Sequence, residues 1–93
     1  MSLRIGLADA LRHVRYAKGL SQEDFSEVSS RTYMSSLERG LKSPTLEKIS
    51  HLAQVMGIHP LTLLTLAYAA SERCTVAELQ ARVRQEIDAL KRS

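Results

Sequence analysis

The side chains best suited to recognising another molecule lie in one short segment, Arg31–Arg39. If this segment is a helix with Met34 and Leu37 pointing inward, its outer face carries two arginines and three hydroxyls: Arg31, Thr32, Ser35, Ser36 and Arg39. Arginine can bridge the two major-groove acceptors of guanine, and hydroxyls can meet base edges or phosphates. A solvated, serine-rich helix face is an equally simple interpretation of the same residues, so composition alone does not choose between them.

No catalytic or metal-binding pattern accompanies these side chains. His13, His51 and His59 stand at unrelated spacings without a cysteine pair, which does not suit a zinc site. We expect His51 on an exposed helix face and His59 where a helix begins. The four glycines form no phosphate-binding loop, and the serines form no nucleophile elbow. We therefore predict no catalytic residue, no metal, no cofactor and no small-molecule ligand, and a protein that is not an enzyme.

Composition limits the chain to one small folded unit. Ninety-three residues allow one domain with one core, and only four of them are aromatic. The net charge of +3 permits a polyanionic partner without requiring one. Cys74 stands alone, which favours a reducing compartment. The first residues lack a signal-peptide pattern, and the apolar run at 61–70 is too short to span a bilayer. We expect a cytoplasmic protein with no membrane contact.

The first half of the chain reads as three helices. Apolar residues three and four apart predict an amphipathic helix over Leu3–Ala17, ended by Gly19. Ser21 can cap a second helix that presents Phe25 and Val28 on one apolar face. Either serine of the pair at 29–30 can cap the third helix, Arg31–Arg39, and Gly40 ends it.

The second half predicts three more helices. Ser43-Pro44 suits a helix start, with Gly57 at the end and an apolar stripe of Leu46, Ile49, Leu52, Ala53 and Met56. The segment Pro60–Ala70 is apolar nearly all round, so either the last helix or a second subunit must cover it. Thr75 and Glu78 form a capping box for a helix over Val76–Lys91. Its narrow apolar stripe is Val76, Leu79, Val83, Ile87 and Leu90.

Several ordered motifs resemble one family. KGLSQEDF, followed by SRTYMSSLERGLKSPTLEKISHLAQVMGI, is similar to the xenobiotic-response-element family of bacterial and phage repressors, which carry a Cro-type helix-turn-helix. The resemblance covers residues 5–66. It implies an all-α fold, a compact five-helix repressor-like domain with a helix-turn-helix, and here one extra C-terminal helix. It also implies binding of double-stranded DNA and regulation of transcription.

The resemblance assigns roles to individual residues. Four of them match base-contacting positions or flank one: Arg31, Thr32, Ser35 and Ser36. Gln22 matches the glutamine that braces phosphate and recognition helix. Together with Arg39, three residues of the loop between helices would contact phosphates: Lys42, Ser43 and Thr45. Arg15 and Glu38 match a structural ion pair that joins the first helix to the end of the third.

One departure from the family pattern concerns the turn before Arg31. The interval from Gln22 to Glu38 is two residues shorter than in the family, and EVSSRT contains no glycine. Ser26 keeps the small residue of the pattern. We therefore expect either a tighter turn or an earlier end to the second helix, and the base-contacting residues depend on which occurs.

The resemblance also bears on organisation and function. We expect a DNA-binding domain at 1–70 and a packing or dimerisation helix at 71–93, with a homodimer through helices 60–70 and 76–91. The main hypothesis is a sequence-specific transcriptional regulator that reads the major groove with residues 31–39. The alternatives are an antitoxin or restriction–modification controller that represses its own operon, and a protein-interaction module that has kept the fold without reading DNA.

Overall fold

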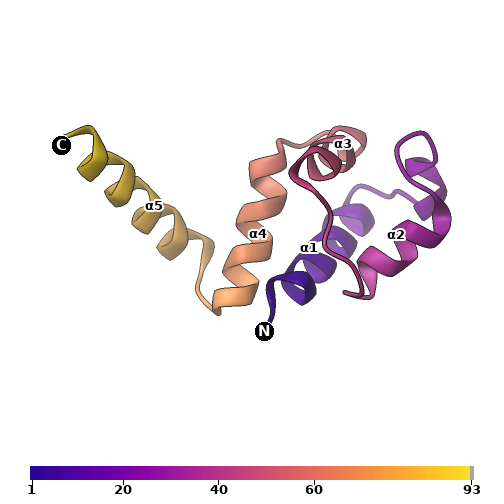
Figure 1. Ribbon diagram of the computed structural model, residues 1–93, viewed down its shortest axis with the longest axis horizontal. Helices are drawn as coiled ribbons and strands as arrows, with labels where there is room; N and C mark the ends of the chain where they lie inside the picture. Colours follow the sequence, from indigo (N-terminus) through magenta and orange to yellow (C-terminus); the bar gives the residue numbers. More distant parts are fainter. Residues whose placement is uncertain (93) are drawn as a thin grey trace.

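The chain folds into α-helices and loops. A computed structural model describes residues 1–92 and contains five α-helices and one 3-10 helix, with no strand in that range. In chain order the elements are α1 (Leu3–Ala17), η1 (Gln22–Phe25), α2 (Arg31–Glu38), α3 (Leu46–Met56), α4 (Pro60–Glu72) and α5 (Val76–Lys91). The all-α fold class predicted from the sequence is confirmed. Figure 1 shows that α1 to α4 gather into one body, while α5 extends away from it.

The core lies between α1, α2, α3 and α4, and it is aliphatic with a single phenylalanine. Its largest fully buried side chains are Phe25, Leu11, Met34, Leu37, Leu52 and Leu63. The helices α1 and α4 pack most intimately, because Gly6 brings the two backbones together. A Cβ atom at Gly6 would lie 2.5 Å from the carbonyl oxygen of Ala67, closer than any side chain tolerates.

Local signals place several helix ends where the sequence predicts them. The helices α1 and α5 have the predicted bounds, and α4 continues two residues past its predicted end. Gly19, Gly40 and Gly57 all have positive φ angles after helices, as expected of C-terminal glycines. His59 caps α4 by accepting the backbone N–H of Leu61, which confirms it as a residue at which a helix begins.

The prediction of a second α-helix after Ser21 is wrong. Its segment forms one 3-10 turn, Gln22–Phe25, and then a turn in which the N–H groups of Val28 and Ser29 both donate to the carbonyl of Phe25. Since this interval is short, the chain reverses at once and Ser30 caps α2. Of the two outcomes expected from the missing residues, the earlier helix end occurs.

The predicted start of α3 is also wrong. The helix begins at Leu46 rather than at Pro44, because Thr45 is the N-cap and its hydroxyl accepts the N–H of Lys48. Leu46 is therefore the first helical residue and points outward, with 74% of its surface exposed. The remainder of the predicted stripe of α3 is buried.

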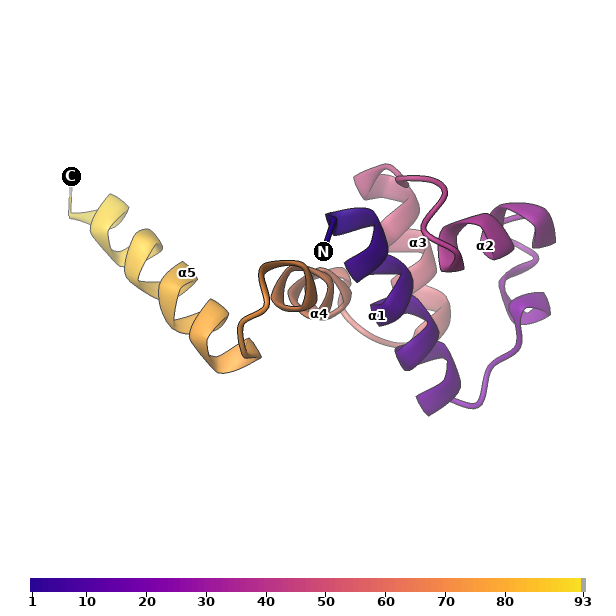
Figure 2. The ribbon, with the colours of Figure 1, turned by 90° about the horizontal axis from the view of Figure 1, so that it is seen from below.

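The C-terminal helix does not cover the apolar outer side of α4. No residue of α5 is buried, and α4 and α5 form a V that opens away from their connection (Figures 1 and 2). This arrangement gives the structure a longest dimension of 45 Å against 24 and 22 Å. The expectation that the last helix might shield α4 is thus not met within one chain.

Within residues 1–92 no single helix is long and apolar enough to cross a membrane. The pair α3 and α4 passes that test only when taken together, and it is bent by 109°.

Candidate nucleic-acid interface

The helix α2 is fixed at both ends by its own sequence. At the N-terminus the hydroxyl of Ser30 accepts the N–H of Tyr33 at 3.1 Å. At the C-terminus Gly40 adopts φ +71°, and the N–H of Leu41 returns to the carbonyl of Ser36 at 3.0 Å. This C-terminal arrangement is a Schellman motif, which satisfies the last free carbonyls of the helix. The helix therefore has a defined length of two turns and a defined direction.

One face of α2 points to solvent. Arg31, Ser35 and Arg39 follow each other at intervals of four residues and so share a side of the helix, with Thr32 beside them. Three of these residues are exposed and Ser35 is half-buried. The opposite side carries Met34 and Leu37 into the core, as predicted. The N-terminal turn of α2 is therefore the most accessible part of this face.

Ser36 does not belong to the exposed face, so its predicted outward position is wrong. Only 7% of its surface is exposed. Ser36 lies about 100° around the helix from Ser35. That rotation turns it toward Gly40, which packs against Ile5 of α1. Its buried side chain is therefore a weaker candidate for a base contact than the exposed side chains of Arg31 and Thr32.

A buried ion pair anchors the end of α2 to α1. Arg15 donates to both carboxylate oxygens of Glu38, with Nε–Oε2 at 2.6 Å and Nη2–Oε1 at 2.8 Å. The side chains are 8% and 5% exposed. The other terminal nitrogen of Arg15, Nη1, donates to the carbonyl of Leu20 at 2.9 Å. The hydrogen bond to Glu38 raises the pKa of Arg15 above its ordinary value. This pair thus ties α1, the following loop and α2 together.

Gln22 is attached to the same ion pair. Its side-chain amide donates to Oε1 of Glu38 at 3.2 Å, from the first position of η1. The residue is half-buried, so one side of the amide contacts α2 while the rest reaches the surface. An amide held in this manner is oriented before any partner arrives.

The loop between α2 and α3 places three polar residues on the surface beside α2. Lys42, Ser43 and Thr45 are all exposed. Thr45 also caps α3, so its hydroxyl already accepts one N–H while the free N–H groups of the first turn of α3 lie next to it. The structure accordingly collects the predicted polar residues in two neighbouring elements, α2 and this loop.

Two positioning residues are absent from the sequence-based prediction. Lys48 of α3 donates to the carbonyl of Val28, and its ammonium lies 5.5 Å from the centre of the Tyr33 ring. Arg12 of α1 donates to the carbonyl of Glu38 at 2.8 Å, at the negative end of the α2 dipole. Contacts between residues 15 or more positions apart leave no periodic signal, so the sequence alone did not reveal them.

An acidic residue faces the first arginine of α2. The guanidinium of Arg31 lies 3.4 Å from Glu23 of η1, and both side chains are more than 70% exposed. An exposed pair of this kind contributes little to stability. It does hold a negative charge beside the surface that carries the arginines.

The described residues contain no group of three or more His, Cys, Asp or Glu side chains placed to hold a metal ion. The three histidines lie on different elements, and His51 is exposed on α3 as predicted. The arrangement around α2 offers hydrogen-bond donors and positive charge, which suit recognition of a polar or anionic surface.

Comparisons with known proteins point in the same direction. Residues 11–63, more than half of the chain, match the helix-turn-helix family. The chain is also 37% identical over 67 residues to an uncharacterized HTH-type transcriptional regulator, y4dJ, of Sinorhizobium fredii. That alignment covers 70% of this chain and 87% of the relative. No solved structure matches the chain.

Proposed function

Because the chain belongs to the helix-turn-helix family, we propose that it is a DNA-binding regulator of transcription and not an enzyme. The observation that carries this proposal is the geometry of α2. Its exposed face holds Arg31, Thr32, Ser35 and Arg39, while both of its ends are tied to the rest of the fold. A recognition helix needs this combination, since only a rigidly placed helix can present side chains to a major groove.

Within this proposal, Arg31, Thr32 and Ser35 contact bases. They occupy the first turn and the start of the second turn of α2, and recognition helices contact base edges with their N-terminal residues. Arg31 would bridge O6 and N7 of a guanine, after exchanging Glu23 for the base. Thr32 and Ser35 are short enough for the helix to lie deep in the groove.

Phosphate contacts flank the bases. Lys42, Ser43 and Thr45 project from the loop after α2, and Arg39 lies at the end of the same exposed face. Gln22 would donate its second amide hydrogen to a phosphate while its first remains on Glu38. Contacts of this type fix the register of the protein on DNA and carry no sequence information themselves.

We further propose that residues 1–70 form the DNA-binding domain and that 71–93 serve dimerisation, with α4 and α5 joining two copies. A two-fold dimer would contact half-sites about 34 Å apart. The motifs GLSQE, YMSSLERG and SPTL support placement in the xenobiotic-response-element branch. A protein that acts on chromosomal DNA, with one free cysteine, fits the cytoplasm.

Selection of binding sites from a randomised duplex pool tests this function. Arg31→Ala should cost about 1–3 kcal/mol on the selected site and relax preference at one base pair. Lys42→Ala should weaken selected and random duplexes alike and reduce the salt slope by about one. Ser36→Ala is the matched control within α2, because a buried serine should leave the selected sequence unchanged.

The outcome separates this proposal from its rivals. Equal losses for Arg31→Ala on selected and random DNA would reject the assignment of base and phosphate contacts. Failure to enrich any sequence would favour a protein-interaction module.

A further inference from the structure

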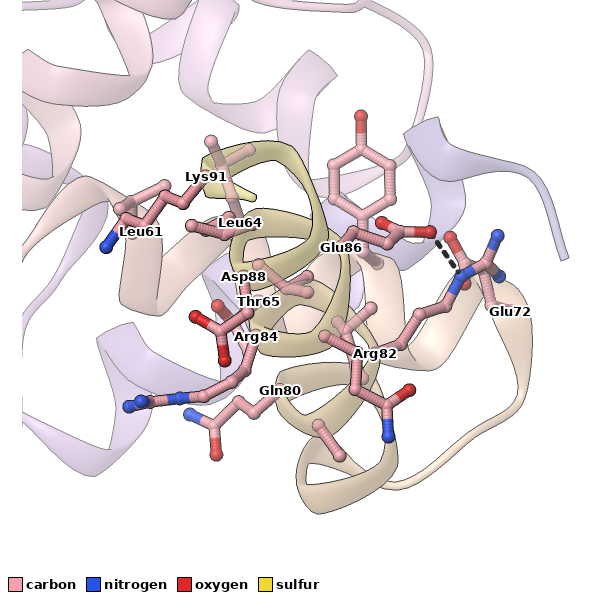
Figure 3. Close-up of a pocket in the computed structure, with 16 residues that line it drawn as sticks. Leu61, Leu64, Thr65, Glu72, Gln80, Arg82, Arg84, Glu86, Asp88 and Lys91 are labelled. Atoms are coloured by element: carbon pink, nitrogen blue, oxygen red, sulfur yellow. Dashed lines mark hydrogen bonds and ion pairs between the residues drawn. The ribbon is translucent and has the colours of Figure 1, made fainter. Parts of the chain in front are cut away.

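The splayed C-terminal helix carries an apolar surface without a cover in the single chain. Val83, Ile87 and Leu90 are 44%, 47% and 73% exposed, and Leu79 is half-buried. On α4, Leu61 and Tyr68 are 62% and 41% exposed. Apart from Leu90, these side chains line a cleft of about 1300 Å³ between α4 and α5 (Figure 3). We refer to it as the α4–α5 cleft.

The V shape of α4 and α5 is fixed by hydrogen bonds at its vertex. Arg73 takes a left-handed conformation (φ 56°), and the N–H of Cys74 bonds to the carbonyl of Ala69 at 3.1 Å. Thr75 and Glu78 then exchange capping-box bonds of 2.9 and 3.0 Å. The chain thus ends α4 and starts α5 with defined geometry. The exposed stripe of α5 is consequently a preformed surface. Most of the stability of a helix in a protein comes from packing of its apolar face, and α5 has no buried residue in the single chain.

The charges that flank this stripe differ between the two halves of α5. Arg82 and Arg84 lie in its first half, whereas Glu86 and Asp88 lie in its second half. Because residues four apart share a side of a helix, Arg82 and Glu86 border one edge of the stripe, where they form an ion pair at 3.1 Å. Arg84 and Asp88 border the other edge. Over the central segment 82–88 each edge therefore reads positive and then negative, with Glu78 before this segment and Lys91 after it.

We propose that the α4–α5 cleft binds α5 of a second copy of this chain, with the two α5 helices antiparallel. In an antiparallel pair about a two-fold axis, each edge of one helix meets the same edge of the other in the reverse direction. Arg84 then faces the partner's Asp88, and Arg82 faces the partner's Glu86. A parallel pair would bring arginines beside arginines and acids beside acids, which disfavours it.

This charge pattern also sets the register. Pairing Val83 with the partner's Ile87 aligns both sets of opposite charges and brings Leu79 near the partner's Leu90. The V shapes of two copies then interlock, and each α5 lies between α4 and α5 of the other chain. This geometry rests on the proposed dimer and specifies its interface. It leaves α2 outside the contact, because α2 and α5 lie at opposite ends of the structure (Figure 2).

Cysteine cross-linking of the full chain tests the orientation. In a Cys74→Ser background, one sample carries Leu79→Cys and a second, larger tagged sample carries Leu90→Cys. In the antiparallel register, position 79 and the partner's position 90 are offset by about one residue rise along the helix axis. Two copies of position 79, or two copies of position 90, are offset by about 15–18 Å along that axis. A disulfide requires Cα atoms within about 7 Å. Mild oxidation should therefore give a mixed-size dimer in the mixture and little cross-linking of either sample alone.

A matched control uses the far side of the same helix. Ala77→Cys lies two residues from Leu79→Cys on the opposite side of the helix, is exposed, and does not line the α4–α5 cleft. Mixed with Leu90→Cys, it should give less than a tenth of the cross-linked product. Sedimentation under reducing conditions should show that every variant still forms dimers.

Three results would overturn the proposal. Cross-linking of Leu90→Cys alone as efficiently as in the mixture would indicate parallel helices. Equal products from Ala77→Cys and Leu79→Cys would indicate random collision. No product in the mixture would place the contact elsewhere or leave the chain monomeric. A DNA shift assay on the same preparations keeps the two questions separate, because a folded chain can bind a half-site even if this interface is wrong.

Discussion

Replacement of Glu38 with alanine should strongly destabilise the fold. The change removes both hydrogen bonds from Arg15 and the one from Gln22, and it leaves the Arg15 guanidinium buried without an acidic partner, beside the Leu20 carbonyl and the Tyr16 ring. Breaking a buried ion pair by deleting one partner costs about 3–5 kcal/mol. Small domains have total stabilities of about 5–15 kcal/mol, so the loss is a large share of the total.

Urea unfolding followed by circular dichroism measures this loss. With a slope of about 1–2 kcal/mol per molar urea, the midpoint should fall by roughly 2–4 M. If Glu38→Ala is too unstable to fold, Glu38→Gln should give an intermediate midpoint, because it keeps an acceptor oxygen without the charge. The double variant Arg15→Met/Glu38→Leu should recover most of the stability, since an apolar pair of similar volume leaves no buried charge.

The control for this prediction is an ion pair on the surface. Glu86→Ala breaks the Arg82–Glu86 pair, whose side chains are 60–70% exposed, and should leave the midpoint unchanged in the monomer range of concentration. If Glu38→Ala shifts the midpoint no more than Glu86→Ala does, the argument that a buried pair ties α1 to α2 is wrong.

Three further predictions address α5, the core and the DNA-facing surface. The capping-box hydrogen bonds lower the pKa of Glu78, so their stabilisation of α5 is fully present above the ordinary glutamate pKa of about 4.3 and is lost as the pH falls through the lower folded value. Glu78→Gln should therefore reduce the acid-dependent loss of helical circular dichroism. An unchanged pH profile would count against this. Gly6→Ala should cost about 1–3 kcal/mol in thermal unfolding, because the new Cβ would clash with the Ala67 carbonyl, and an unaltered melting temperature would refute that close approach. Glu23→Gln should tighten binding to all duplexes by a few-fold at low salt by freeing Arg31 and removing a negative charge, whereas weaker binding would mean that the pair positions the arginine.

Local chemistry made most helix ends predictable. The bounds of α1 and α5 follow from apolar spacing together with caps such as the Thr75–Glu78 box. The C-terminal glycines mark the ends of helices for a similar reason, because few other residues adopt a left-handed conformation without strain. These features depend on residues within four positions of one another.

The failures concern features that depend on distant parts of the chain. The segment after Gln22 had caps and apolar spacing suited to an α-helix, but the short interval before α2 left room for only one 3-10 turn. The sequence predicts an outward-facing Ser36, yet the packing of the folded chain leaves only 7% of its surface exposed. The sequence predicts a buried Leu46 because Ser43-Pro44 resembles a helix start, whereas the N-cap of α3 is Thr45, two residues later.

The direction of α5 was likewise not predictable. It depends on Arg73, a residue with no marked preference for the left-handed conformation that it adopts at the vertex. The exposed face of α2 was largely predictable, because Met34 and Leu37 define its inner side.

The central claim is that this chain binds DNA, and a salt-dependent shift assay with the duplex upstream of its own gene tests it most directly. The account predicts a discrete complex at 50 mM salt. The logarithm of its binding constant should fall linearly with the logarithm of the salt concentration. Addition of random competitor DNA should leave that complex in place when the upstream duplex contains the site. Absence of any complex at 50 mM salt, from a protein that circular dichroism shows to be folded, would contradict the account.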